Sequence, residues 1–335
     1  MRVAIVGTGS MGSLLGHGLQ RGGHQVTLID LPHRIEQIRA MKGLALVDEA
    51  GSVSTVEPFM ATSDYSAAGA QDVVILATKA QDLPAVAPNL PRLFNTDTIV
   101  LTVQNGIPWW YLLGLSGELA GAHIHCLDPD HTLERSVPRS RIVGCVAYPA
   151  ASLDPDGRVR HVEGRRFPVG ELDGTIRDRT RAAADMLEDA GFKSRVIQDI
   201  RSEIWLKALG ALSLNPISAL TRATMVEICS FVPTRDLAAA MMREAQSIAA
   251  ALGATLRRSI EERLDGAKAV GPHKTSMLQD VEAGRPLEVD ALLEVILELA
   301  DLTRIEAPTI RSIHACTALL NNVIQSRGTR AGDQV

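Results

Sequence analysis

The sequence predicts an α/β domain with a doubly wound parallel sheet, followed by an all-helical domain. Three observations predict this. The first 30 residues have the pattern strand, glycine turn, helix, strand, further apolar strands follow, and strand signals stop near Ile200. A chain of 335 residues is long enough for about two domains. We place the α/β domain at residues 1–198, the helical domain at 199–325 and a disordered polar tail at 326–335.

Composition and charge exclude several classes of protein. With 46% hydrophobic and 22% charged residues, the chain has the composition of an ordinary soluble globular protein. A net charge of −5 offers no basic footprint, so we expect neither nucleic acid nor a membrane as partner. Four scattered cysteines without a C-x-x-C pair, and no export or membrane-spanning segment that we recognise, predict a cytoplasmic protein.

The first βαβ unit predicts a Rossmann-type nucleotide-binding domain. In "VAIVGTGSMGSLLGHGLQRGGHQVTLID" a buried strand (3–6) leads through a glycine turn into a helix that Gly22-Gly23 ends, and a second strand (26–29) follows. The turn carries G-x-G-x-x-G between a strand and a helix, where it binds a pyrophosphate at the helix N-terminus. The predicted cofactor-binding residues of this turn are Gly7, Gly9, Ser10, Met11 and Gly12.

Asp30 ends the second strand, where a carboxylate accepts hydrogen bonds from an adenosine ribose and repels a 2′-phosphate. This residue favours NADH over NADPH as the cofactor. Two alternatives stay open at this point: Asp30 merely opens the turn before Pro32, or Arg34 meets a phosphate.

Polar residues follow two of the later predicted strands. Further strand patterns cover residues 72–79, 98–106, 141–150, 158–164, 165–172 and 194–198. The first two are apolar runs suited to a parallel sheet, and ligands gather at the carboxyl ends of such strands. Lys79 and Asn105 occupy these ends, and we expect both to contact cofactor or substrate. The alternatives are a solvated loop lysine and an ordinary Asn-Gly turn.

The segment "HIHCLDPDH" offers potential metal ligands. On a strand, His123 and His125 would share one face, as a zinc site could use. However, Asp-Pro-Asp indicates a turn, and no second cluster of ligands is evident. The interpretation that we favour is scattered histidines on an exposed strand, with no metal site.

The helical half contains a lysine in an apolar setting. In "IWLKALGALSLNPISAL", Lys207, Ala211 and Asn215 are spaced i, i+4, i+8 and share one helix face. A buried ammonium needs a partner or a function, whereas a lysine that reaches the surface needs neither. Pro216 predicts a bend or break. The expected helices are 202–214, 216–227, 234–252, 259–267, 277–283, 286–303 and 308–325.

A second stretch, "KTSMLQDVEAGRPLEVDALL", supplies polar residues to the helical domain. Ser276 with Gln279 matches a capping box, and Pro286 suits a helix start, which places Glu288 in the first turn of the next helix. Helix capping alone would account for Ser276, and the helix dipole for Glu288.

The glycine-rich start, "TKAQ", "QNG" and the two C-terminal stretches, in this order, resemble the ketopantoate reductase (2-dehydropantoate 2-reductase) family over residues 1 to 322. The resemblance implies reduction of 2-dehydropantoate to D-pantoate with NADPH, on the route to pantothenate, by a Rossmann domain and a helical domain with the active site between them.

The resemblance also implies roles for individual residues. Lys207 matches the catalytic lysine that protonates the carbonyl oxygen, and Glu288 matches the acidic residue that orients lysine and substrate. The residues that match substrate-binding positions are Ser276, Asn215, Asn105 and Lys79, and the last two also lie near the cofactor.

Two positions depart from the family pattern. Ala211 replaces an asparagine that binds substrate in many members, and Leu31 replaces an arginine for the NADP 2′-phosphate. The leading hypothesis is a nicotinamide-dependent reductase of 2-dehydropantoate or a related branched 2-keto acid. An NAD-dependent D-2-hydroxyacid dehydrogenase, a non-catalytic dinucleotide sensor and a metal enzyme that uses the His123 cluster are the alternatives. The sequence leaves the oligomeric state open, a homodimer included.

Overall fold

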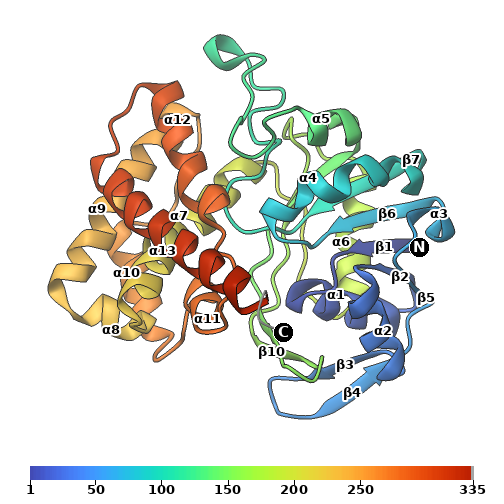
Figure 1. Ribbon diagram of the computed structural model, residues 1–335. Helices are drawn as coiled ribbons and strands as arrows, with labels where there is room; N and C mark the ends of the chain where they lie inside the picture. The colour runs from blue at the N-terminus through green and yellow to red at the C-terminus, as the bar shows by residue number, and fades with distance from the viewer. Residues whose placement is uncertain (333–335) are drawn as a thin grey trace. The chain divides into compact units, whose positions relative to one another are not determined.

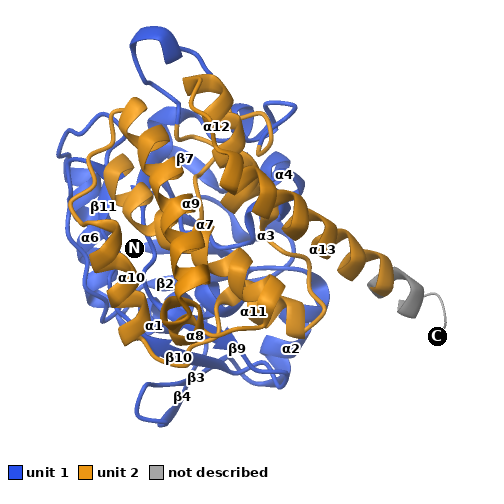
Figure 2. Cartoon of the chain, turned by 90° about the vertical axis from the view of Figure 1, so that its left-hand side faces the viewer, with its two compact units in different colours: residues 1–104, 112–123, 128–200 blue, residues 105–111, 124–127, 201–335 orange. Residues whose placement is uncertain are grey.

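The computed structural model describes residues 1–332 and divides into two compact units (Figure 2). Unit 1 comprises residues 1–104, 112–123 and 128–200, and unit 2 comprises residues 105–111, 124–127 and the chain from Arg201 onward. The main division falls between Ile200 and Arg201, close to the predicted boundary at 198/199. Two short segments from the predicted first domain belong to unit 2, and one of them begins with Asn105.

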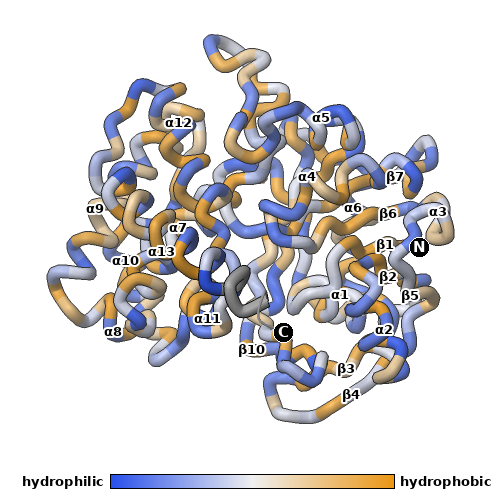
Figure 3. Tube along the Cα trace, in the orientation of Figure 1, coloured by the Kyte–Doolittle hydropathy of each residue, from blue (hydrophilic) through white to orange (hydrophobic). Residues whose placement is uncertain are grey.

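Unit 1 is built on a seven-stranded sheet with strand order β11-β8-β7-β6-β1-β2-β5, of which Figure 1 labels β7, β6, β1, β2 and β5. All neighbouring pairs are parallel except β11 with β8. The inner strand β1 is fully buried at Val3, Ala4 and Ile5, as expected for a parallel sheet that is covered on both faces. Figure 3 shows the same apolar character along β1 and β2. The strands are β1 (Arg2–Val6), β2 (Gln25–Ile29), β5 (Met60–Thr62), β6 (Gln71–Leu76), β7 (Phe94–Thr102), β8 (Ile142–Cys145) and β11 (Val169–Gly170).

The chain leaves β1 in one direction to β2 and β5, then crosses to the other side for β6, β7 and β8. The point where the order reverses lies between β1 and β6, and ligands bind at such a point outside the carboxyl ends of the strands. The predicted fold class, a doubly wound parallel sheet followed by a helical region, is confirmed.

A second sheet of four strands, with order β4-β3-β10-β9, was not predicted. Its strands are β3 (Leu44–Val47), β4 (Val53–Val56), β9 (Ala150–Leu153) and β10 (Val159–Glu163). Helix α1 (Ser10–Arg21) contacts this sheet, and the Nε2 of His17 lies 3.0 Å from the Oγ of Ser54. The strand predicted at 194–198 is reduced to an isolated bridge between Val169 and Val196.

The helices of unit 1 lie mainly in the first hundred residues. Helices α1 and α6 contribute to the same apolar core, through Leu14, Leu19 and Met186 among others. The helical segments are α2 (Pro32–Ala40), α3 (Tyr65–Ala68), η1 (Ala80–Asp82), α4 (Leu83–Val86), η2 (Ala87–Leu93), η3 (Gly117–Leu119), α5 (Thr132–Ser136), η4 (Arg139–Arg141) and α6 (Asp178–Asp189).

Unit 2 is helical. Its elements are α7 (Ile200–Thr221), α8 (Met225–Ser230), α9 (Val232–Ala251), α10 (Ile260–Ala269), α11 (Ser276–Glu282), the π-helix η5 (Asp290–Glu294), α12 (Val295–Thr303) and α13 (Pro308–Gly332). Ser259 and Glu262 form a capping box at the start of α10, where the sequence pattern predicted a helix to begin. None of the helices within residues 1–332 combines the length and apolar character that crossing a bilayer would require.

The predicted break at Pro216 is wrong, because α7 continues through it as one helix. Proline lacks an N–H and crowds the preceding turn, which costs roughly 3 kcal/mol in a helix interior. Residues on both sides of it are buried, including Leu212, Leu214 and Ile217. The burial of these apolar side chains outweighs that cost, so the helix continues through Pro216.

Three further predictions in unit 2 need correction. Thr275, not Ser276, caps α11, because the Thr275 hydroxyl accepts the N–H of Leu278 at 3.2 Å. Glu288 lies just before the next helical segment rather than in its first turn. Helix α13 continues to Gly332, so residues 326–332 of the predicted tail are helical, and its last residues, 333–335, lie outside the described part of the chain.

Candidate active site

The glycine turn after β1 has the geometry of a phosphate-binding turn. Gly7 has φ +95°, and a Cβ on Gly7 would lie 2.5 Å from the backbone N of Thr78. A Cβ on Gly12 would lie 1.9 Å from the carbonyl oxygen of Gly7, so the helix can approach the strand only with glycine there. A Cβ on Gly9 would meet no atom within 4 Å. The first and third glycines therefore close the turn, whereas Gly9 leaves room for a ligand such as a pyrophosphate. Ser10 and Met11 begin α1 beside it.

Asp30 stands at the carboxyl end of β2, and its carboxylate is tied to the glycine turn. Its Oδ2 accepts hydrogen bonds from the backbone N and the hydroxyl of Thr8, the latter at 2.6 Å. Its Oδ1 accepts the N–H of Leu31 at 2.7 Å. A carboxylate offers about four acceptor positions, so Asp30 retains capacity for a ribose hydroxyl at Oδ1. Burial and, to a lesser extent, the charge of Asp30 raise the pKa of the half-buried Tyr65 hydroxyl to about 12.

Arg34 supports the glycine turn from within unit 1. Its side chain is buried, with Nε donating to the carbonyl of Thr8 at 3.1 Å and Nη2 donating to the hydroxyl of Ser13 at 3.2 Å. Burial lowers the pKa of Arg34, an effect that the charge of Asp30 partly offsets. The guanidinium is thus engaged beneath the glycine turn, and the alternative role of Arg34 at a phosphate, which the sequence left open, stays a prediction.

The ends of β6 and β7 lie side by side. The amide nitrogen of Gln104 donates to the carbonyls of Leu76 and Thr78, at 2.8 and 3.1 Å. Among the described residues, the Thr78 hydroxyl and the Gln104 amide oxygen are buried without a hydrogen-bond partner. Buried polar atoms usually have partners, so this edge of the sheet fits a ligand that carries polar groups, as a dinucleotide does. Lys79 follows Thr78 and is half-buried before η1.

In unit 2, Lys207 of α7 donates a hydrogen bond from its Nζ to the Oδ1 of Asn105 at 2.8 Å. The rest of this turn of α7 is apolar and buried at Ile204, Trp205 and Ala208. The structure therefore joins two residues that lie 102 positions apart in the sequence and that were both predicted to belong to the site.

The position of Asn105 depends on the residue that follows it. Gly106 has φ +83°, and a Cβ there would lie 1.8 Å from the carbonyl oxygen of Ala291 in the π-helix η5. The same carbonyl accepts the N–H of Ile107 at 3.2 Å. The Asn-Gly pair is thus more than a surface turn, because Gly106 lets the segment lie against η5. No sequence pattern predicted a π-helix at this point.

Buried aromatic residues hold the same segment against α7. The indole N–H of Trp205 donates to the hydroxyl of Tyr111 at 2.7 Å, and the two rings meet edge to face. Both side chains are fully buried. Sequence reasoning did not identify Tyr111 as a positioning residue, because nothing local distinguishes it from any core aromatic.

Of the remaining predicted site residues of unit 2, Asn215 and Ser276 lie near each other. The amide nitrogen of Asn215 lies 3.5 Å from the hydroxyl of Ser276, which α11 does not use as its cap. Ala211 is half-buried on α7 between the turns of Lys207 and Asn215. Glu288 is half-buried between the buried Leu287 and Val289, and the N–H of Leu287 donates to the side-chain oxygen of Asn321 at 2.9 Å. The predicted pairing of Glu288 with Lys207 stays a prediction.

From the sequence, an exposed strand was predicted for the histidine-rich segment. This prediction is wrong, because the segment forms a series of turns. His123 approaches His131 and Glu134 rather than sharing a strand face with His125. Burial and the carboxylate of Glu298 raise the pKa of the neighbouring Cys126 thiol, which disfavours its thiolate form.

Comparisons with known proteins agree with this geometry. The family model described as "Ketopantoate reductase PanE/ApbA" matches residues 3–174, and the model of the C-terminal part of the same family matches residues 199–321. A 2-dehydropantoate 2-reductase of Mesorhizobium japonicum is 39% identical over 98% of this chain and 99% of its own length.

Solved structures are similar over the same span. A protein of Ralstonia solanacearum MolK2, described as a ketopantoate reductase, shares 32% identity and a TM-score of 0.91 over 97% of this chain and 98% of its own. A D-mandelate dehydrogenase bound to NADH and anilino(oxo)acetate has a TM-score of 0.81 at 22% identity, over 97% of this chain and all of its own, and so shares the fold. Since the two family models and the relative at 39% identity together span almost the whole sequence, the chain belongs to the ketopantoate reductase family of NAD(P)-dependent oxidoreductases.

Proposed function

We propose that this enzyme reduces the keto group of a 2-keto acid to a hydroxyl group, with 2-dehydropantoate as the leading substrate and D-pantoate as its product. The relative from Mesorhizobium japonicum carries the name of this reaction. When bound, the reduced nicotinamide supplies the hydride. The remaining chemistry, binding the acid and delivering a proton to oxygen, belongs to side chains of the protein.

Lys207 is the proposed general acid. As hydride adds to the carbonyl carbon, negative charge develops on the oxygen, and an ammonium within hydrogen-bond distance both stabilises that charge and delivers the proton. The observation that carries this proposal is the 2.8 Å hydrogen bond from the Nζ of Lys207 to Asn105. An amide oxygen that accepts one N–H fixes the direction of the flexible lysine side chain.

The other polar residues have proposed roles in binding. Ser276 and Asn215, 3.5 Å apart, would donate hydrogen bonds to the substrate carboxylate and hydroxyl groups. Glu288 would orient the lysine and contact the substrate. Lys79, at the carboxyl end of β6, would contact cofactor or substrate.

We further propose that the enzyme prefers NADH to NADPH. Asp30 would accept a ribose hydroxyl and repel a 2′-phosphate. The adjacent Leu31 is 63% exposed and offers no charge, and the guanidinium of Arg34 is engaged beneath the glycine turn. Neither of these two neighbours therefore offers an exposed cationic group to a 2′-phosphate.

A second candidate is an NAD-dependent D-2-hydroxyacid dehydrogenase. Ala211 favours it, because a methyl group on the face of Lys207 and Asn215 cannot hydrogen-bond the substrate as an asparagine would. A smaller or more apolar side chain on the 2-keto acid would fit such a wall better than the hydroxymethyl group of 2-dehydropantoate.

Steady-state reduction of a panel of 2-keto acids, with NADH and NADPH in parallel, tests both candidates. The panel contains 2-dehydropantoate, 2-ketoisovalerate, pyruvate and phenylglyoxylate. The highest kcat/KM with 2-dehydropantoate supports the first candidate, and the highest value with an acid that lacks the hydroxyl group supports the second. Absence of turnover with every acid and both cofactors would contradict the proposed reaction type.

A further inference from the structure

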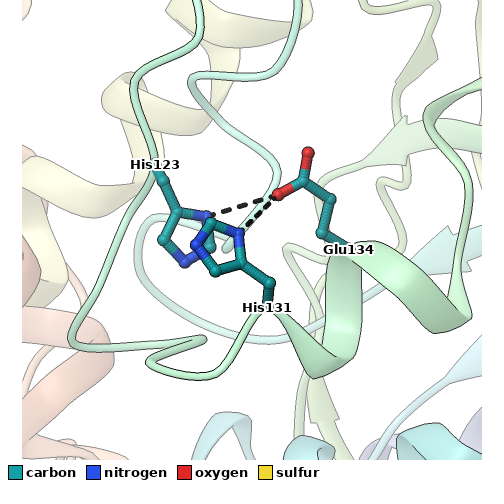
Figure 4. Close-up of side chains that lie close together, drawn as sticks. All are labelled: His123, His131 and Glu134. Carbon is teal, nitrogen blue, oxygen red and sulfur yellow. Dashed lines mark hydrogen bonds and ion pairs between the residues drawn. The ribbon is translucent and has the colours of Figure 1, made fainter.

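We propose that His123, His131 and Glu134 of unit 1 form a zinc site. The imidazole rings of the two histidines stack with their centroids 3.8 Å apart (Figure 4). Both Nδ1 atoms point at the same carboxylate oxygen, Oε2 of Glu134, at 3.5 Å from His123 and 3.1 Å from His131. This inference is independent of the proposed reductase activity, because it concerns other residues and another ligand.

Two of the three separations between the ligand atoms fit a tetrahedral ion, and all three atoms lie within 4.8 Å of one another. Zinc bonds nitrogen and oxygen ligands at about 2.0–2.2 Å, which separates neighbouring ligand atoms by roughly 3.3 Å in tetrahedral geometry. The two measured separations lie on either side of that value. Two imidazoles and one carboxylate favour zinc or a similar transition metal over magnesium or calcium, which prefer oxygen ligands.

The tautomer of His123 also points to a cation. Its Nε2 lies 2.5 Å from the backbone carbonyl oxygen of Asp128, and a carbonyl can only accept, so Nε2 carries the proton. In the neutral ring, Nδ1 then presents a lone pair toward the carboxylate of Glu134, and two acceptors face each other. A cation between them satisfies both. Metal-binding histidines commonly donate their other N–H to a backbone carbonyl in this way.

Asp128 organises all three proposed ligands. It is 1% exposed, and its carbonyl accepts the N–H of His131 at 3.0 Å in addition to the ring of His123. Its carboxylate accepts the N–H groups of Leu133 and Glu134 at 2.9 and 3.0 Å, which fixes the start of α5. The side chain of His131 is 52% exposed and that of Glu134 is 40% exposed, so an ion can enter from solvent and retain a water ligand. The bound ion would fasten the 123–131 loop to α5.

The test is a titration of the chelator-treated full chain, without an added histidine tag, with ZnCl2 by isothermal calorimetry. The Cys316→Ser variant serves as the background, because Cys316 is an exposed thiol that could bind zinc independently. We expect one ion per chain, and an affinity at least tenfold weaker in both His131→Asn and Glu134→Gln. Asn is chosen because His131 has φ +54°, which Asn tolerates.

The matched control is His33→Gln, which removes an exposed histidine of the same unit and should leave the affinity unchanged. Cobalt(II) provides a second readout, since its visible absorption in a four-coordinate site should be present in wild type and lost in His131→Asn. Circular dichroism confirms that each variant is folded. The absence of saturable binding near one equivalent would overturn the proposal, as would equal affinities of the wild type, His131→Asn and Glu134→Gln.

Discussion

At the scale of single residues, Lys207 carries the proposed chemistry. Replacing it with alanine removes both the proton donor and the charge next to the developing alkoxide. We expect Lys207→Ala to lower kcat by a factor on the order of 10² or more, as loss of a general acid typically does. The measurement is kcat with the best acid of the substrate panel.

The control for this variant is Lys268→Ala, which removes an exposed lysine of the same unit. It should retain the wild-type kcat. Asn105→Ala should give an intermediate loss, because it leaves the ammonium in place but removes the acceptor that orients it. If Lys207→Ala turned over as fast as wild type while folded, another proton donor would have to be sought.

Asp30 decides the cofactor preference at the same scale. We expect kcat/KM to be higher with NADH than with NADPH, and Asp30→Ala to narrow that ratio by roughly tenfold, the equivalent of about 1.4 kcal/mol of charge repulsion. Asp30→Asn keeps hydrogen-bonding groups near Thr8 without the charge, and so separates repulsion from structural support. An unchanged ratio in both variants would show that Asp30 serves only to hold the turn.

At the scale of elements, the glycines of the β1–α1 turn have separable functions. Gly12→Ala should disturb the turn itself, because its Cβ would collide with the carbonyl of Gly7, and it should lower both melting temperature and cofactor affinity. Gly9→Ala should keep the melting temperature of wild type, since its Cβ meets no protein atom, yet bind cofactor at least tenfold more weakly.

Circular dichroism measures the melting temperature of each variant. Titration with NADH, followed by fluorescence, measures its cofactor affinity. Gly23→Ala is a control, because Gly23 also has positive φ and an unobstructed Cβ but lies at the far end of α1. It should cost some stability and leave the affinity of the folded protein unchanged. Wild-type NADH affinity in Gly9→Ala would mean that no pyrophosphate lies against this turn.

The elements of the sheet could be predicted because their patterns are local. The apolar run of β1, the glycines after it and Asp30 at the end of β2 are contiguous in the sequence and each has one dominant physical explanation. The second sheet could not be predicted, since β3, β4 and β9 are short and the pairing of β10 with β3 spans more than a hundred residues. The helix through Pro216 was mispredicted because burial of its neighbours outweighs the local preference.

The predicted site residues of unit 2 were identified by resemblance and by their unusual setting, but the contacts that position them are tertiary. The hydrogen bond of Lys207 to Asn105 and the approach of Gly106 to Ala291 join distant segments, and the π-helix that makes the latter contact has no sequence signature. In unit 1, the partners of His123 were also missed, because a strand was assumed where the chain makes turns.

At the scale of the whole molecule, the two units contain different reporters. Trp109, Trp110 and Trp205 all belong to unit 2, so tryptophan fluorescence follows the unfolding of that unit. Unit 1 has no tryptophan among its residues, and its unfolding has to be followed by hydrogen exchange of backbone amides. Tryptophan fluorescence alone would therefore report the unfolding of unit 2 but not that of unit 1.

This separation allows a prediction for the pH dependence of unit 1. Burial of the imidazole, assisted by the charge of Arg21, lowers the pKa of His17 from 6.5 to about 4. The folded state thus favours the neutral ring, whereas the unfolded chain takes up a proton near pH 6.5. The contribution of His17 to stability is therefore fully present above pH 6.5 and is lost as the pH falls toward 4, by about 3 kcal/mol.

Glu171 adds a second loss of stability, at lower pH. Its burial opposes ionisation, but the hydrogen bonds from Arg179 and Thr180 outweigh that effect and lower its pKa from 4.5. Its contribution is present above pH 4.5 and disappears only as the pH falls through this lowered value. The two groups therefore act in successive pH ranges, and the range between pH 6.5 and about 4.5 separates the contribution of His17 from that of Glu171.

The measurement is the free energy of opening of the α1 amides by hydrogen exchange at pH 7, 6 and 5. Wild type should lose stability steadily over this range, and His17→Gln, which preserves a hydrogen-bonding group near Ser54, should lose much less. His33→Gln removes an exposed histidine and should behave as wild type. If His17→Gln showed the same slope as wild type, the pH dependence would have to come from another group, with His24 the first to examine, because burial lowers its pKa as well.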